Sequence, residues 1–342
     1  MNEYIIHNNN NLQKNIDIVI FIITFNRKNM LERILKSYNN LESNFNIIII
    51  DNGTNDKECI KYLYSLDYTI LQFNELYKTN LKNSYEQLIS NIQTSIDFYY
   101  NHNFSKYYAV SDVDISFEKT SKDVLNIYRE MIDLLNCNVG PELDILDIPD
   151  YYPLKMKIIL DTKHIFLPEY PTNKITINNK EIKYHRSNID TTFTMFLYKT
   201  NMNYKPCNNN IRVLYPYTAL HLDWYFNAVD LDSDSLIYMN TAEGLGGYAS
   251  GYIKNFVNNI LNNKVNIDNF LVTFNYEEKN ILSYHIDWYF AYWLLSSGFY
   301  NIPKDIEKAN KLVLNYIDYQ INIEKKDWYD GVNRIKLVKK YF

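Results

Sequence analysis

The chain has 342 residues, of which 46% are hydrophobic and 22% are charged, and its formal net charge at pH 7 is −5. This composition is typical of a globular protein with a sizeable core, of about two domains by length, and it excludes an intrinsically disordered chain. A negative net charge, with lysines spread along the chain, gives no electrostatic case for nucleic acid or an anionic membrane as a partner.

Cysteine usage and the N-terminus favour a cytoplasmic protein. Cys59, Cys137 and Cys207 lie far apart without metal-ligand spacing, which indicates reduced thiols. The polar start of the chain predicts no signal peptide, and the apolar run Ile16–Thr24 is too short to span a bilayer. Residues with A/T-rich codons, including 33 tyrosines, suggest a low-GC source such as a parasite or a large DNA virus. A viral protein would act in the host cytoplasm or a virus factory.

The first hundred residues alternate between predicted strands and helices. The β-branched run Ile16–Thr24 predicts a strand buried on both faces, and an amphipathic helix follows Arg27. The next predicted elements are, in order, the strand Phe45–Ile50, the helix Lys57–Leu66, the strand Tyr68–Phe73, the helix Leu81–Tyr100 and the strand Tyr107–Val110. This order predicts an α/β fold with a Rossmann-like, mostly parallel open sheet flanked by helices.

The pattern changes after Glu118. We expect a helix over Asp123–Leu135 and strands over Leu143–Ile148, Thr191–Tyr198 and Asn210–Pro216. From about Ser250 the periodicity is helical almost to the end. The predicted organisation is therefore a polar N-terminal tail (1–15), an α/β domain (16–250) and a C-terminal helical region (251–342).

Polar residues follow three of the predicted parallel strands. In open α/β sheets ligands bind beyond the carboxyl ends of the strands. The residues at these ends, which are the candidates for nucleotide contacts, are Thr24, Phe25, Asn26, Arg27, Asp51, Asn52 and Asp112. Neither the dinucleotide-binding glycine pattern nor a Walker lysine motif is present, which leaves a metal ion to hold phosphates.

The pair Asp112 and Asp114 is the strongest candidate for that metal site. Mg²⁺ and Mn²⁺ prefer oxygen ligands, and such sites take one or two carboxylates with phosphate oxygens and water. Neighbours at i and i+2 of a strand point the same way, so we expect both carboxylates to face one cleft. A solvated turn is the alternative for a bare Asp-x-Asp triplet.

The first half of the chain resembles metal-dependent glycosyltransferases of the GT-A fold, near the large family 2 group. The similarity rests on VIFIITFNR and on IIIIDNGTND, which is similar to the D-N-x-S/T-x-D that ends the second strand in that group. The resemblance implies that Thr24, Asn26 and Arg27 line a uracil and ribose pocket and that Asp51 contacts the base.

The middle of the chain resembles a smaller set of GT-A sequences over roughly residues 16 to 245. Their pattern runs V-T-D-P-D, then L-D-D-L-P-D-x-Y-P-L-K, D-T-T-F and H-L-P-W-Y. This chain reads VSDVD at 110–114, LDIPDYYPLK at 146–155, DTTF at 190–193 and HLDWY at 221–225. Val113 and Asp223 replace prolines of the pattern, and the glycine-rich segment after the third strand is absent.

The resemblance implies roles around the metal. Asp114 is the expected direct ligand, and Asp112 reaches the metal through water or holds the ribose. His221 is the expected third protein ligand, since neutral imidazole suits Mn²⁺. The alternative for His221 is a core histidine with satisfied hydrogen bonds.

Other candidates concern catalysis and the acceptor. Asp190 is the candidate general base for an acceptor hydroxyl, or else a cap that bonds Thr192. Either Lys155 or Arg186 contacts the diphosphate, and the sequence does not choose between them. The candidates for the sugar or acceptor site are Asp147, Asp150, Lys155, Trp224 and Tyr225. For these the alternatives are a structural turn in the 146–155 loop and core packing of the two aromatic rings.

The sequence as a whole predicts a glycosyltransferase that uses a UDP- or GDP-sugar, UDP being favoured, with Mn²⁺ or Mg²⁺. Inversion at the sugar is implied by the resemblance alone. The acceptor is a glycan, protein or lipid. Two alternatives remain: a sugar-nucleotide nucleotidyltransferase, and a non-catalytic nucleotide-sugar or glycan-binding or structural protein. The C-terminal helices are candidates for binding the acceptor or for a homodimer contact.

Overall fold

A computed structural model describes residues 3–8, 15–74, 81–145, 148–149, 158, 172–189, 192–200, 204–205, 210–225 and 232–241. The chain divides into two compact units, of which the first comprises Met1–Asp144, Pro171–Asp223 and Asp232–Gly246. Nearly all described residues belong to this first unit, and the fold below is that of this unit. The predicted helices after Ser250 and the boundary at residue 250 lie outside the described residues and stay predictions.

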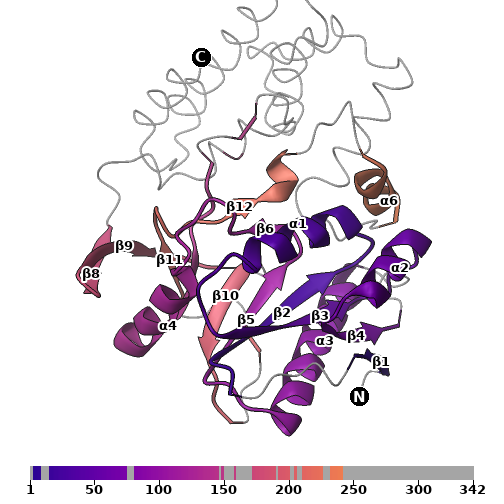
Figure 1. Ribbon diagram of the computed structural model, residues 1–342, viewed down its shortest axis with the longest axis horizontal. Coiled ribbons are helices and arrows are strands. Elements are labelled where there is room, and N and C mark those ends of the chain that lie inside the picture. The colour runs from indigo at the N-terminus through magenta and orange to yellow at the C-terminus, as the bar shows by residue number, and fades with distance from the viewer. Residues whose placement is uncertain are drawn as a thin grey trace, which may run out of the picture. The chain divides into compact units, whose positions relative to one another are not determined.

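The described residues form a ten-stranded mixed sheet in the order β1-β4-β3-β2-β5-β10-β7-β11-β9-β8 (Figure 1). Four neighbouring strands are parallel to one another: β2 (Ile18–Thr24), β3 (Phe45–Asp51), β4 (Thr69–Phe73) and β5 (Tyr107–Asp112). The helices between them are α1 (Lys28–Tyr38), α2 (Lys57–Ser65) and α3 (Leu81–His102). The predicted α/β fold with a parallel sheet is confirmed in this half.

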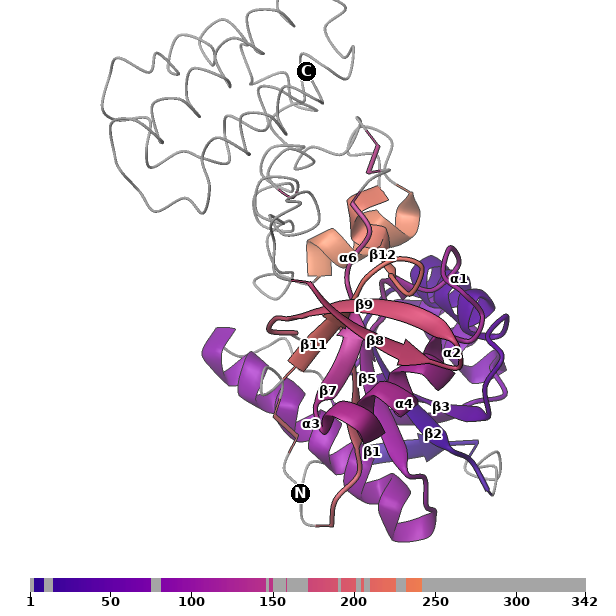
Figure 2. The same cartoon turned by 90° about the vertical axis from the view of Figure 1, so that its left-hand side faces the viewer.

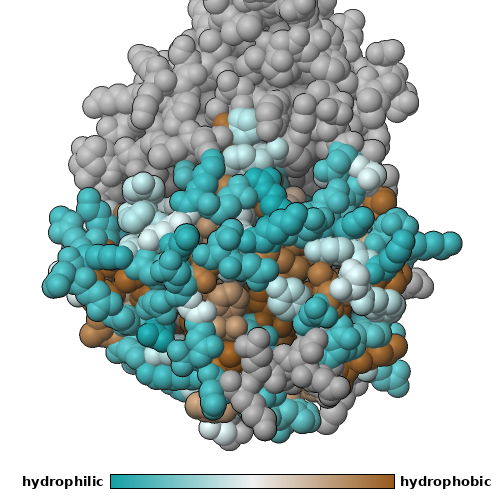
Figure 3. All heavy atoms as spheres, viewed as in Figure 1, coloured by the Kyte–Doolittle hydropathy of each residue, from teal (hydrophilic) through white to brown (hydrophobic). Residues whose placement is uncertain are grey.

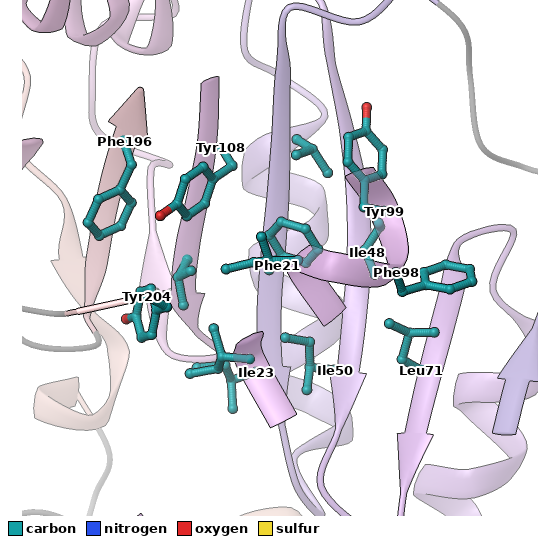
Figure 4. Packing of buried hydrophobic residues seen from close by; sticks show 14 of the residues in the cluster. Phe21, Ile23, Ile48, Ile50, Leu71, Phe98, Tyr99, Tyr108, Phe196 and Tyr204 are labelled. Atoms are coloured by element: carbon teal, nitrogen blue, oxygen red, sulfur yellow. The ribbon is translucent and has the colours of Figure 1, made fainter. Parts of the chain in front are cut away.

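Alternate residues of the parallel strands form a buried core with α3 on one face of the sheet (Figure 4). Phe21 lies at its centre and meets Tyr99 of α3 edge to face, with ring centroids 6.2 Å apart. On the opposite face, Phe117 packs edge to face on Tyr38 of α1 and on Phe193. Helices α1 and α4 (Val124–Leu135) cover this second face. Burial on both faces explains why β2 is apolar at almost every position.

Beyond β5 the sheet becomes mainly antiparallel. β10 (Phe193–Leu197) runs antiparallel to β5 and to β7 (Asn138–Pro141), and β7 pairs in parallel with β11 (Asn210–Val213). The predicted elements at α4, β10 and β11 are confirmed, although β11 ends before Pro216. The predicted strand Leu143–Ile148 is wrong, because the strand lies earlier and Leu143 makes only an isolated bridge to Ala219.

Two strands outside the predicted set form a hairpin at the sheet edge, as Figure 2 shows: β8 (Asn173–Ile177) and β9 (Lys180–Arg186). The two residues between them, Asn178 and Asn179, both have positive φ, at 50° and 63°. Two-residue hairpin loops favour this conformation, and asparagine tolerates it better than other non-glycine residues. The Asn-Asn pair was therefore a usable sequence signal for the hairpin.

The N-terminal segment also contributes a strand, within residues for which the sequence predicted only a polar tail. β1 (Tyr4–His7) pairs antiparallel with β4 at the sheet edge, and the Tyr4 ring lies 5.4 Å from that of Phe73. A strand of four residues is too short to give a periodicity signal, and the polar Asn-rich run that follows makes the segment resemble a loop.

Gly140 marks a close approach between β7 and β10. A Cβ atom at this position would lie 2.3 Å from the carbonyl oxygen of Phe193 and 2.8 Å from Cδ1 of Ile189. Because the first of these neighbours is backbone, we expect Gly140→Ala to lower the free energy of unfolding by roughly 1–3 kcal/mol. Urea denaturation would measure this. Lys61→Ala on the exposed face of α2 is the control and should change stability by less than about 0.5 kcal/mol.

Polar side chains predominate on the face of the described residues seen in Figure 3, with apolar ones visible between them. None of the helices that the structure describes combines the length and the apolar character needed to cross a bilayer.

Candidate functional site

The candidate site is built at the carboxyl edge of the parallel strands. Thr24 ends β2 and pairs with Asp51, the last residue of β3, while Ile23 pairs with Asp112 at the end of β5. The three polar clusters predicted at strand ends therefore lie along one edge of the sheet.

Asn26 ties the loop after β2 to the loop after β3. It adopts a left-handed conformation with φ of 49° and is 1% exposed. Its side-chain oxygen accepts hydrogen bonds from the backbone N–H groups of Asn55 and Asp56, both at 3.0 Å. Its side-chain nitrogen donates to Oδ1 of Asn55 at 2.8 Å. Asn26 therefore connects the two loops by hydrogen bonds, which is a structural role.

Asp51 and Asn52 are engaged within the protein. Asp51 accepts from the backbone N–H of Thr54 at 3.0 Å and from Nε2 of Gln72 at 3.2 Å. Burial raises the pKa of Asp51, and the hydrogen bonds from Thr54 and Gln72 oppose that shift. Asn91 of α3 donates to the side-chain oxygen of Asn52 at 2.9 Å, while the Nδ2 atom of Asn52 is buried without a hydrogen-bond acceptor among the described residues.

All the nucleotide candidates from these two loops are deeply buried. The exposed fractions are 1% for Thr24, 4% for Phe25, 1% for Asn26, 3% for Arg27, and 0% for Asp51 and Asn52. Contact between these side chains and a nucleotide therefore requires the covering groups to move, and their nucleotide roles stay predictions.

Asp114 does not continue the strand that Asp112 ends. Val113 and Asp114 form a turn between β5 and the short strand β6 (Ile115–Ser116). The expectation that strand geometry alone points both carboxylates the same way is therefore wrong. The backbone N–H of Asp112 donates to the carbonyl of Thr192 at 3.0 Å, which ties this strand end to the start of β10.

A second, two-stranded sheet brings His221 to Asp114. β6 pairs antiparallel with β12 (Leu220–His221), and His221 stands opposite Ile115. The backbone N–H of Leu222 donates to the carbonyl of Asp114 at 2.7 Å. As a result, Nδ1 of His221 lies 3.6 Å from Oδ2 of Asp114.

Arg27 and Asp223 complete a cluster of charges around Asp114. The guanidinium of Arg27 donates to both carboxylate oxygens of Asp223, with Nη1 at 3.2 Å from Oδ2. The same guanidinium lies 4.1 Å from the centre of the Tyr238 ring. Tyr238 belongs to α6 (Ser233–Thr241), so residues distant in sequence meet at the end of β2.

The two carboxyl groups of the cluster differ in their tendency to hold a proton. Burial raises the pKa of Asp114 to about 6, the neighbouring Asp223 carboxylate adds to this shift, and His221 and Arg27 oppose it. For Asp223, burial acts in the same direction, but the charge and hydrogen bonds of Arg27 outweigh it and lower the pKa. The positive charge of Arg27 therefore compensates the carboxylate of Asp223 more fully than that of Asp114.

The residues at Asp114 fit a hard divalent cation in part. Oδ1 of Asp114 is buried and accepts no hydrogen bond from the described residues, while Oδ2 of the same carboxylate faces the imidazole of His221 at 3.6 Å. The described residues contain no group of three His, Cys, Asp or Glu side chains that could hold a metal ion. A site of this kind would need further ligands from phosphate or water, as is usual for Mg²⁺.

Several predicted site residues lie outside the described residues: Asp147, Asp150, Lys155 and Asp190. Trp224 and Tyr225 belong to a short 3-10 helix, Leu222–Tyr225, and are half-buried. The proposed roles of all six stay predictions.

Three residues that contact Arg27 or the start of α1 were outside the predicted site: Asp223, Tyr238 and Asp234, whose carboxylate accepts from the backbone N–H of Lys28 at 2.7 Å. Asp223 was visible only as a departure from proline in the HLDWY motif. Asp234 and Tyr238 gave no sequence signal, because their contacts to the loop after β2 span more than two hundred residues of chain.

No family model and no curated protein matches the sequence. The chain resembles several solved structures at low sequence identity. One is a mannosyltransferase from Pyrobaculum calidifontis in complex with GDP-Man and Mn²⁺, with 9% identity, a TM-score of 0.36 and coverage of 96% of this chain and 90% of that chain. Another is S. aureus TarS 1–349, with 12% identity, a TM-score of 0.35 and coverage of 95% and 91%. TM-scores below 0.5 are too low to assign an activity to this chain.

Proposed function

We propose that the chain is a metal-dependent glycosyltransferase that transfers a sugar from a nucleoside-diphosphate sugar to an acceptor hydroxyl. The observation that carries this proposal is the meeting of Asp114 and His221, 3.6 Å apart, beyond the carboxyl end of β5. Ligands of open α/β sheets bind at this edge, and the chain offers no glycine-rich phosphate loop there.

Asp114 and His221 would hold the cation, and Asp112 would assist through water or hold the ribose. When bound, Mn²⁺ or Mg²⁺ supplies positive charge for the departing diphosphate. The buried, cation-poor surroundings of Asp114 favour a divalent ion, since Arg27 is already paired with Asp223.

In this proposal Asp190 acts as general base, taking the proton of the acceptor hydroxyl, with inversion at the sugar. The residues proposed for the sugar and acceptor are Asp147, Asp150, Lys155, Trp224 and Tyr225. The proposed donor is a UDP- or GDP-sugar, the acceptor a glycan, protein or lipid, and the location the cytoplasm. The helices after residue 250 would bind the acceptor or a second copy.

A thermal-shift experiment tests the donor site. UDP, GDP and their common sugars are added with and without Mn²⁺ to the wild type and to Asp114→Ala. A ligand at about 100 times its dissociation constant stabilises the folded state by roughly 2.7 kcal/mol. We expect the wild type to shift only when nucleotide and Mn²⁺ are both present, and Asp114→Ala to lose that shift.

Asp17→Ala is the matched control, because Asp17 is a surface carboxylate that pairs with Arg129 at 3.0 Å. The Asp17→Ala variant should show the same thermal shift as the wild type. The absence of a shift in the wild type with every nucleotide would instead favour a non-catalytic protein.

A further inference from the structure

Two carboxylates from the segment after β12 accept hydrogen bonds from positively charged groups that follow β2, namely the guanidinium of Arg27 and the N-terminus of α1. Asp223 accepts both guanidinium hydrogen bonds of Arg27. Asp234 accepts from the backbone N–H of Lys28 at 2.7 Å and of Asn29 at 3.2 Å, in the first turn of α1. A helix N-terminus carries partial positive charge and is a ready anion site. The chain's own anions therefore stand at both places where a phosphate could bind.

The two partners of the Arg27 pair differ in their exposure. The side chain of Arg27 is 4% exposed and that of Asp223 is 25% exposed, so the carboxylate is the more accessible member. The Nε–H of Arg27 is buried and has no hydrogen-bond acceptor among the described residues. The hydroxyl of Thr24, 1% exposed, is also unpartnered there. Unused buried hydrogen-bonding groups in this loop point to a missing ligand rather than to a completed structural ion pair.

We propose that Asp223 and Asp234 are internal anions, and that the diphosphate of a nucleoside diphosphate binds by replacing them at Arg27 and at the start of α1. The inference rests on the proposed function and extends it to residues of the chain beyond the metal site.

The proposal makes the two carboxylates competitors of the ligand. A site that is open for only a fraction of the time binds with an affinity reduced by that fraction. Neutralising a competitor raises the open fraction, so the ligand should bind more tightly. If Asp223 instead only orients Arg27 for the ligand, neutralising it should weaken binding.

Calorimetric titration of the full chain with inorganic pyrophosphate, in metal-free buffer with EDTA, separates these outcomes. The variants are Asp223→Asn and Asp234→Asn, which keep a side-chain hydrogen-bond acceptor. The matched control is Glu118→Gln. Glu118 accepts two hydrogen bonds, at 3.0 and 2.6 Å, from Arg33 on the exposed side of α1. Titrations with UDP and GDP in the same buffer show whether a nucleoside diphosphate behaves as pyrophosphate does.

We expect each of the two site variants to bind pyrophosphate and UDP or GDP at least tenfold more tightly than the wild type, and Glu118→Gln to bind as the wild type does. Unchanged or weaker binding, a gain for pyrophosphate without one for the nucleotides, or an equal gain in Glu118→Gln would overturn the inference. If Asp223→Asn does not fold, the binding measured with Asp234→Asn tests the inference, since this variant leaves the ion pair of Arg27 with Asp223 intact. A wild type that gives the Mn²⁺-dependent nucleotide shift without tighter binding by the variants would refute this inference alone.

Discussion

Asp114→Asn is expected to stabilise the metal-free protein at pH 8 and to have little effect at pH 4. Burial, aided by Asp223, raises the pKa of Asp114 from its ordinary 3.8 to about 6. The folded wild type therefore binds more protons than the unfolded chain between these values, and its free energy of unfolding falls as the pH rises through them. Since one pKa unit corresponds to about 1.4 kcal/mol, the pH-dependent part of the gain is at most about 3 kcal/mol.

Urea denaturation of wild type and variant with EDTA at pH 4 and pH 8 measures this difference. The comparison of variant with wild type at each pH removes the titration of all other groups. Asp17→Asn, at a surface carboxylate whose side chain is 51% exposed, serves as the control and should change stability by less than about 0.5 kcal/mol at both pH values. An Asp114→Asn effect that is the same at both pH values would show that Asp114 is not a strained carboxylate in the folded state.

A residue whose charge destabilises the fold is a familiar mark of a functional site. Asp114 could be replaced by many neutral residues if stability alone mattered. In the proposed function a bound cation would compensate the charge of Asp114, which lies beside His221 and Asp223, and this links the stability prediction to the proposed donor site.

Much of the parallel half of the fold was predictable because periodicity is strong there. The apolar runs at Ile18–Thr24 and Phe45–Asp51 leave no alternative to buried strands. In the antiparallel half most strands have only four or five residues, and β8 and β9 are largely exposed, so the hydrophobic pattern is weak there. The strand Asn138–Pro141 contains a glycine and a proline, and because both residues are uncommon inside strands, they argue against a strand there.

The candidate site was predictable only in the part that motifs mark. Asp114 and His221 were proposed for one site, and β6 pairing with β12 brings them within 3.6 Å. The contacts of Arg27 with Asp223 and Tyr238 were not predictable, because they depend on where the 3-10 helix after β12 and helix α6 lie. Periodicity carries no information on such a tertiary contact.

Arg27→Ala is expected to lower the free energy of unfolding by about 3–5 kcal/mol. Removing one member of a buried ion pair leaves the other charge uncompensated, which is more damaging than losing the attraction itself. Here the loss would leave Asp114 and Asp223 as neighbouring carboxylates without the charge of Arg27, and it would remove the contact with the Tyr238 ring. Because the side chain of Asp223 is 25% exposed, water can screen it, and the lower end of the range is expected.

Arg33→Ala, in helix α1, provides a comparison. Arg33 also pairs with a carboxylate through two hydrogen bonds, yet its side chain is 48% exposed, so its loss should lower stability by no more than about 1 kcal/mol. The double variant Arg27→Ala/Asp223→Ala should recover part of the loss, because no unpaired Asp223 charge remains. If Arg27→Ala were no more destabilising than Arg33→Ala, solvent would already reach the Arg27 pair in the folded protein. Arg27 would then be open to an anion without displacement of Asp223, and burial would not be what limits access to this edge of the sheet.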